Sequence, residues 1–205
     1  KAGTITTHRE KYFYRWTDPY PMTLNDLTHG QSAPNDQQRL VAGMLSLQNL
    51  LDIIRIFTIF SINDKGKKIK IVCRYQQFRA VKKMVKRLQE GKTKEDRGGI
   101  LWHTQGSGKS LTMMFLVRQM QLITALQSWK VVFVTDRTQL EEQLGETGGG
   151  VGFNLKKAEF INPRADKPMC SLKELLSTNS SDLVMAMIHK FQESGELDDI
   201  QIFPV

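Results

Sequence analysis

The stretch of sequence that decides the fold reads GILWHTQGSGKSLTM over residues 99–113. An apolar start leads into a glycine-rich loop that ends in Lys109 and Ser110, and a helix-compatible sequence follows. Phosphate-binding loops of nucleotide-binding proteins have this order of strand, loop and helix. The sequence therefore predicts a strand over residues 99–102 and a helix from Lys109 to about Leu126.

Each residue type in this loop has a chemical reason to be there. Gly106 and Gly108 let the backbone curl so that successive amide groups point inward, and the helix N-terminus adds a partial positive charge. Lys109 is expected to reach the β- and γ-phosphates of ATP, and the Ser110 hydroxyl to bind Mg²⁺. We interpret Lys109 and Ser110 as the catalytic residues of this chain. The full set of nucleotide-binding residues expected in the loop is Thr104, Gln105, Gly106, Ser107, Gly108, Lys109, Ser110 and Leu111.

One position departs from the usual phosphate-loop pattern. The standard pattern opens with Gly or Ala, and here that position is His103. The alternative interpretation is a glycine-rich turn between a strand and a helix, in which the Lys-Ser pair is incidental. The agreement of strand, loop and helix signals favours the phosphate-binding loop.

Downstream of the loop, short apolar segments alternate with helical ones. Residues 131–134 and 183–188 have strand character, and capping-box patterns begin at Thr138 and Ser171. Strands separated by helices are typical of parallel βαβ units. The predicted fold class is α/β, with a parallel sheet.

Upstream of the loop, apolar periodicity predicts a mainly helical segment. Leu40, Met44, Leu47 and Leu51 recur every three or four residues from Asp36 onward, as one buried face of a helix requires. A hairpin follows, with two strands flanking good turn residues, and then a helix with an apolar face. The ranges are 57–62 and 68–73 for the strands, 63–66 for the turn, and Phe78 to Leu88 for the helix face.

Composition narrows the functional class. The 205 residues hold 29 Lys and Arg against 21 Asp and Glu, a net charge of +8 that favours a polyanionic partner such as nucleic acid. No apolar run approaches the ~18 residues that would span a bilayer, so we expect no membrane association. Cys73 and Cys170 belong to no Cys/His array, which favours a reducing cytosol over a disulfide or zinc framework. The chain starts without Met or a signal peptide, which indicates a start inside a longer polypeptide.

Four stretches carry a resemblance to a known family. They are RYQQFRAV at 74–81, GILWHTQGSGKSLTM at 99–113, VFVTDRTQLEEQ at 132–143 and MIHKFQ at 187–192. Together they resemble the R subunit of type I restriction endonucleases, a superfamily 2 DNA translocase, over most of residues 10–203. His103, unusual in a general phosphate loop, looks typical of that family.

The resemblance implies further site residues. Gln77 matches a glutamine that recognises adenine, with Arg74 nearby; without the family match, an exposed Gln at a helix start is an equal alternative. Thr135 and Arg137 match a motif expected near the DNA backbone or a domain interface. The alternative there is local, with Asp136 as a cap and Arg137 as its ion-pair partner.

The resemblance also implies an organisation and an activity. Residues 1–73 are expected to connect to a nuclease domain outside the chain, and residues 74–205 to form the N-terminal portion of a first RecA-like motor domain, incomplete at its C-terminus. The intact subunit is expected to be an ATP-dependent type I site-specific deoxyribonuclease that moves along double-stranded DNA. Its partners would be the modification (methyltransferase) and specificity subunits.

The same resemblance shows what the sequence lacks. It contains no Asp-Glu-x-His for hydrolysis and no nuclease motif, so the chain alone is expected to be inactive. Three alternatives stay open. They are another superfamily 2 DNA or RNA helicase or translocase, a nucleotide-binding module without motor function, and a nucleic-acid-binding fragment with a vestigial loop.

Overall fold

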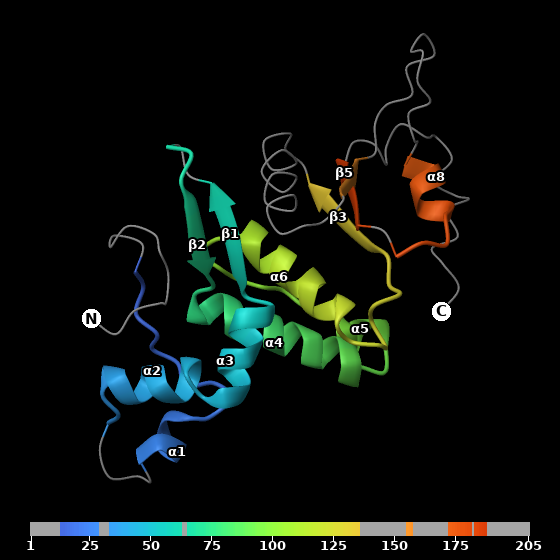
Figure 1. Cartoon of the computed structure of the whole chain (residues 1–205). Coiled ribbons are helices and arrows are strands. Elements are labelled where there is room, and N and C mark those ends of the chain that lie inside the picture. Colours follow the sequence, from blue (N-terminus) through green and yellow to red (C-terminus); the bar gives the residue numbers. More distant parts are fainter. Residues whose placement is uncertain are drawn as a thin grey trace. The chain divides into compact units, whose positions relative to one another are not determined.

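The computed structural model describes residues 13–28, 33–62, 65–135, 155–157, 172–181 and 183–187. The chain divides into two compact units, residues 1–125 and 126–205. Figure 1 gives the order of the elements in each unit. The predicted capping boxes at Thr138 and Ser171, and Arg137, lie outside the described residues.

The first unit begins with the helices α1 (Leu24–Thr28), α2 (Asp36–Met44) and α3 (Leu47–Arg55). The prediction of one continuous helix from Asp36, with Leu47 and Leu51 on its buried face, is wrong. Leu47 is 74% exposed and Leu51 is 54% exposed.

A buried amide explains why the helix breaks between α2 and α3. Asn49 Nδ2 donates to the carbonyl oxygen of Gly43 at 2.8 Å and to that of Tyr20 at 2.9 Å. In an uninterrupted helix the Gly43 carbonyl would instead accept the backbone N–H of Leu47, four residues on. The break turns α3 so that Asn49 and Ile53 are buried in place of the expected leucines.

The predicted hairpin is confirmed. Strand β1 (Thr58–Ile62) pairs antiparallel with β2 (Lys68–Val72), with Thr58 opposite Val72. Residue Cys73 follows β2 and is fully buried, and this burial raises the pKa of its thiol.

The predicted amphipathic helix is α4 (Tyr75–Glu90), which buries Phe78, Val81 and Val85 as expected. A short helix, α5 (Lys94–Arg97), occupies what the sequence predicted to be a polar loop. It forms because Thr93 and Asp96 cap each other's backbone N–H groups at its start.

The core of the first unit is aromatic. The ring of Phe57 lies 4.9 Å from that of Phe78 on α4 and 5.3 Å from that of Phe115 on α6 (Lys109–Gln121), measured between centroids. Trp16 packs on the other side of Phe78, at 5.8 Å. These contacts hold α4 and α6 side by side (Figure 1), so that the segments bearing Gln77 and the glycine-rich loop meet.

The predicted strand over residues 99–102 is wrong. Ile100 is 97% exposed and Trp102 is 87% exposed, and the segment pairs with no strand among the described residues. A strand in a sheet exists only through hydrogen bonds to a neighbour, so apolar character alone cannot form one. The helix after the loop also ends earlier than expected, at Gln121.

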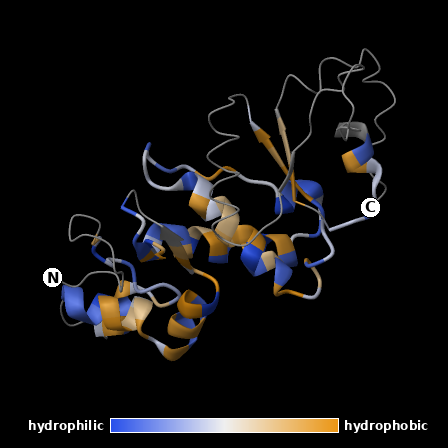
Figure 2. Ribbon diagram, turned by 45° about the horizontal axis from the view of Figure 1, so that its top comes forward, coloured by the Kyte–Doolittle hydropathy of each residue, from blue (hydrophilic) through white to orange (hydrophobic). Residues whose placement is uncertain are grey.

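The second unit contains a small parallel sheet. Its order is β3 (Val131–Thr135), β5 (Leu183–Met187) and β4 (Leu155–Lys157), and both pairings are parallel. Figure 2 shows that β3 and β5 are predominantly hydrophobic. Two of the predicted strands are therefore confirmed, and the chain has a mixed α/β fold.

Helix α8 (Leu172–Ser177) packs against this sheet. Its Leu175 forms an apolar cluster with Val184 and Ala186, and Val132 contacts the cluster. The ammonium of Lys130 donates to the carbonyl oxygens of Leu175 and Leu176, at 2.6 and 3.1 Å, where the helix leaves carbonyls unpaired. No helix in the described part of the chain is long and apolar enough to cross a membrane.

Candidate nucleotide-binding site

The glycine-rich loop has the curled backbone that the sequence predicts. Gly106 has a φ of 73° and Gly108 a φ of 82°, in the left-handed region that other residues rarely adopt. The N–H of Ser107 bonds the carbonyl of Thr104 at 3.3 Å, which closes the turn before helix α6 begins at Lys109. A Cβ on Gly106 would meet nothing within 4 Å, so open space adjoins the loop there.

Lys109 folds back over the start of its own loop. Its ammonium donates to the carbonyl oxygens of His103 at 3.0 Å and Thr104 at 3.1 Å. These are neutral acceptors on an exposed part of the chain, so the charge of Lys109 stays uncompensated by them. An anionic phosphate is a stronger acceptor than two amide carbonyls and would draw the ammonium toward it.

Gln77 joins the upstream segment to the loop. Its side chain is only 2% exposed, so the alternative interpretation as an exposed Gln is wrong. Its Oε1 accepts the backbone N–H of Arg74 at 2.8 Å, and its Nε2 donates to the carbonyl of Gly108 at 3.0 Å. A Cβ on Gly108 would lie 2.6 Å from that Nε2, so only glycine permits this approach.

Two buried polar atoms near the loop have no partner among the described residues. They are Ser107 Oγ and His103 Nδ1. Buried polar groups are nearly always hydrogen-bonded, so these atoms fit a site that is completed by a polar ligand or by water. Burial, and then the charge of Lys109, lower the pKa of the His103 imidazole.

Tyr14 is a site residue that the sequence did not indicate. The Arg74 guanidinium lies over its ring, 3.6 Å from the centroid. Arg74 directly precedes α4 and is joined through its backbone to Gln77. The two residues are 60 positions apart in the chain, and no local sequence pattern predicts their contact.

Helix α6 is anchored firmly behind the loop. The guanidinium of Arg118 donates to the carbonyl oxygens of Thr58 and Arg55, each at 2.9 Å, and burial lowers its pKa. The hydroxyl of Thr112 bonds the carbonyl of Gly108 at 3.0 Å within the first turn. Ser110 lies half-buried in the same turn. A rigid helix fixes the direction of the amide groups at its start.

The structure brings one group of predicted residues together. Arg74, Gln77 and the loop residues form a single site in the first unit. Thr135 is buried at the end of β3 in the second unit. No group of three or more His, Cys, Asp or Glu side chains suited to a metal occurs in the described ranges.

Comparisons with known proteins place this site in a family. The model of the SWI2/SNF2 ATPase family matches residues 76–203, which include the loop and Gln77. The chain belongs to the SWI2/SNF2 ATPase family. No solved structure gives a significant match.

The chain is also similar to curated proteins whose names agree with the expected resemblance. The type I restriction enzyme HindI endonuclease subunit of Haemophilus influenzae is 34% identical over 165 residues, 79% of this chain. A Methanocaldococcus jannaschii protein named as a type I restriction enzyme MjaIXP endonuclease subunit is 34% identical over 157 residues, 74% of this chain. The matches cover 15% and 14% of those relatives. The resemblance to type I restriction endonuclease subunits is confirmed.

Proposed function

We propose that this chain is the ATP-binding part of a motor that moves along double-stranded DNA in the restriction subunit of a type I restriction enzyme. One observation carries the proposal: a curled glycine-rich loop at the start of a rigid helix, held by the buried amide of Gln77. The family match and the names of the similar proteins support it.

The geometry suggests how each residue acts. The loop amides and the N-terminus of α6 would bind the phosphates of ATP, and the Lys109 ammonium would leave the carbonyls of His103 and Thr104 to join them. Ser110, in the first turn of α6, would hold Mg²⁺, which supplies positive charge against the phosphates. Adenine recognition by Gln77 and Arg74 is part of the proposal.

The proposal extends to the wider architecture. The parallel sheet of β3, β5 and β4 would belong to a RecA-like motor domain that begins at residue 74, following a connector over residues 1–73. Thr135 and Arg137 would contribute DNA or interface contacts after β3. In the intact enzyme the modification and specificity subunits would be partners, and the 205 residues alone would bind nucleotide and hydrolyse little.

The test of this function uses the complete polypeptide that contains this chain, assembled with its modification and specificity subunits. We expect ATP hydrolysis that rises on adding duplex DNA, and DNA cleavage that requires ATP; Lys109→Ala should abolish both. Hydrolysis that is insensitive to DNA would contradict a motor function, and unchanged activity in Lys109→Ala would contradict the assigned site.

A second candidate is a SWI2/SNF2-type translocase that does not cleave DNA, which the family match by itself favours. The same preparation distinguishes the two, because such a protein would show DNA-stimulated hydrolysis without ATP-dependent cleavage of the duplex.

A further inference from the structure

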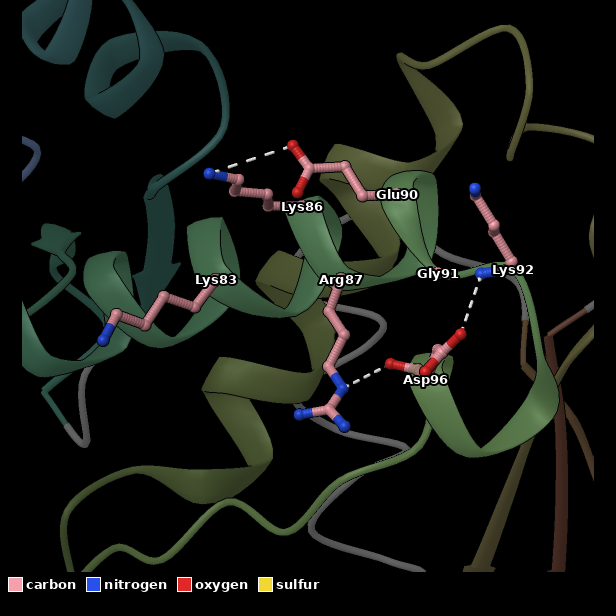
Figure 3. A pocket seen from close by; sticks show the side chains of 7 residues that line it. All are labelled: Lys83, Lys86, Arg87, Glu90, Gly91, Lys92 and Asp96. Carbon is pink, nitrogen blue, oxygen red and sulfur yellow. Dashed lines mark hydrogen bonds and ion pairs between the residues drawn. The ribbon is translucent and has the colours of Figure 1, made fainter.

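A cationic pocket lies away from the glycine-rich loop, where α4 ends and α5 begins. Its volume is about 500 Å³. Lys83, Lys86 and Arg87 line it from the last turns of α4, and Lys92 lines it from the following loop (Figure 3). We propose that this pocket binds the phosphodiester backbone of duplex DNA, an inference that rests on the proposed motor function.

Charge is concentrated around this pocket. Residues 79–97 hold eight of the 29 Lys and Arg of the chain, against three of its 21 Asp and Glu. The net charge of this segment is +5, but Arg79 and Lys82 do not line the pocket and pair with Asp18 and Asp52 outside the segment, which leaves +3. Such clustering of cations in a short stretch of chain is typical of a nucleic-acid contact.

The carboxylates in the lining neutralise these cations only in part. The Asp96 carboxylate accepts the backbone N–H groups of Lys92 and Thr93, at 3.3 and 3.1 Å. Glu90 lies 3.8 Å from Lys86 in an exposed pair, a kind of contact that is weak in water. Lys83 and Lys92 make no ion pair among the described residues. Four cations thus line the pocket, against two carboxylates.

One cation is already held in place. The Arg87 side chain donates to the backbone carbonyl of Asp96 (Figure 3) and to that of Glu95, so neutral acceptors orient its guanidinium. The same bonds join α5 to the last turns of α4. A cation ordered before binding loses less side-chain entropy when it meets a phosphate.

The lining favours a phosphodiester backbone over exposed bases. The lining residues include no aromatic ring on which a base could stack, as single-strand binding usually requires. The lysines are flexible point charges, which suit phosphates at variable spacing without reading sequence. A motor that moves along DNA needs contacts of this sequence-independent kind.

The experiment measures binding of a fluorescein-labelled duplex to the 205-residue chain by anisotropy, over a series of KCl concentrations. The test variant is the triple substitution Lys83→Ala, Lys86→Ala and Lys92→Ala, which leaves Arg87 and the loop fold intact. The matched control removes three exposed lysines of the hairpin, Lys65→Ala, Lys67→Ala and Lys68→Ala. Circular dichroism and the urea midpoint verify that both variants fold.

We expect the pocket triple to weaken duplex binding, and the hairpin triple to leave it close to wild type. Each phosphate contact contributes about −0.9 to the slope of log K against log salt, so the slope should shrink by about 2.7 in the pocket triple. Equal losses in the two triples, or none in the pocket triple, would overturn the inference while leaving the ATP site untouched.

A further arm distinguishes the backbone of DNA from free phosphate. Inorganic phosphate, added at the ionic strength of the KCl it replaces, should displace the duplex no more than KCl does. If phosphate displaces the duplex more than KCl does, and this extra displacement disappears in the pocket triple, the pocket binds small anions and the proposal is overturned. The proposal is also overturned if the wild-type chain binds no duplex. Nucleotide binding is tested separately, with Lys109→Ala.

Discussion

The bond between Gln77 and the loop makes the most specific prediction. Gln77→Ala removes the acceptor of the Arg74 N–H at 2.8 Å and the donor to the Gly108 carbonyl at 3.0 Å. Each such hydrogen bond contributes about 1 kcal/mol, but only the bond to Gly108 reaches the loop, so about 1 kcal/mol of the free energy that holds the loop in its curled form is lost.

This loss should appear in nucleotide binding. If the curled loop is the binding form, its population falls and the apparent Kd for ATP rises by the same factor. About 1 kcal/mol corresponds to roughly a fivefold increase, which is an upper bound because the loop can rearrange. Gln77→Glu keeps the acceptor but loses the donor and places a negative charge beside the phosphate site, so it should bind at least as poorly.

The assay is a titration of a fluorescent ATP analogue with Mg²⁺, and the neighbouring residue provides a matched control. Gln76 is exposed on the first turn of α4, and Gln76→Ala should bind like the wild type. Equal affinities in Gln77→Ala and Gln76→Ala would contradict the role assigned to the bond between Gln77 and the loop. Repeating the titration with a GTP analogue separates two roles of Gln77. If Gln77 acts by holding the loop, Gln77→Ala weakens the binding of both nucleotides equally. If Gln77 recognises adenine, Gln77→Ala weakens the binding of ATP more.

Three further predictions concern the same site. Gly108→Ala should weaken nucleotide binding more than Gly106→Ala, because both have positive φ but only a Cβ at residue 108 meets Gln77; the same titration measures this. Tyr14→Ala should weaken binding by about two- to fivefold, given the ~0.5–1 kcal/mol of an exposed cation–π contact, whereas Tyr14→Phe and the equally exposed Phe13→Ala should not. Folding lowers the pKa of His103, so as the pH falls the unfolded state binds a proton at this residue before the folded state does. The urea concentration at the unfolding midpoint should therefore decrease when the pH is lowered past about 6.5, and it should decrease less in His103→Gln.

Local patterns predicted much of the fold. The hairpin follows from turn residues between two apolar segments, and α4 from an apolar face repeated every three or four residues. The curled loop follows from glycines at the two positions that have positive φ. In each case the residues that determine the structure lie next to one another in the chain.

The errors arose where distant residues decide the structure. The break between α2 and α3 depends on the Asn49 side chain, which bonds Tyr20, 29 positions away. The segment 99–102 has strand-like residues but no strand partner among those described. The contact of Tyr14 with Arg74 joins residues 60 positions apart. The spacing of apolar residues along the chain carries no information about such long-range contacts.

The proposed function requires the glycine-rich loop to bind the phosphates of ATP through Lys109. The most direct measurement titrates a fluorescent ATP analogue with Mg²⁺ into the wild-type chain, into Lys109→Ala and into the exposed-lysine control Lys67→Ala. We expect saturable binding in the wild type and in Lys67→Ala, and its loss in Lys109→Ala. Equal binding by all three, or binding by none, would contradict it.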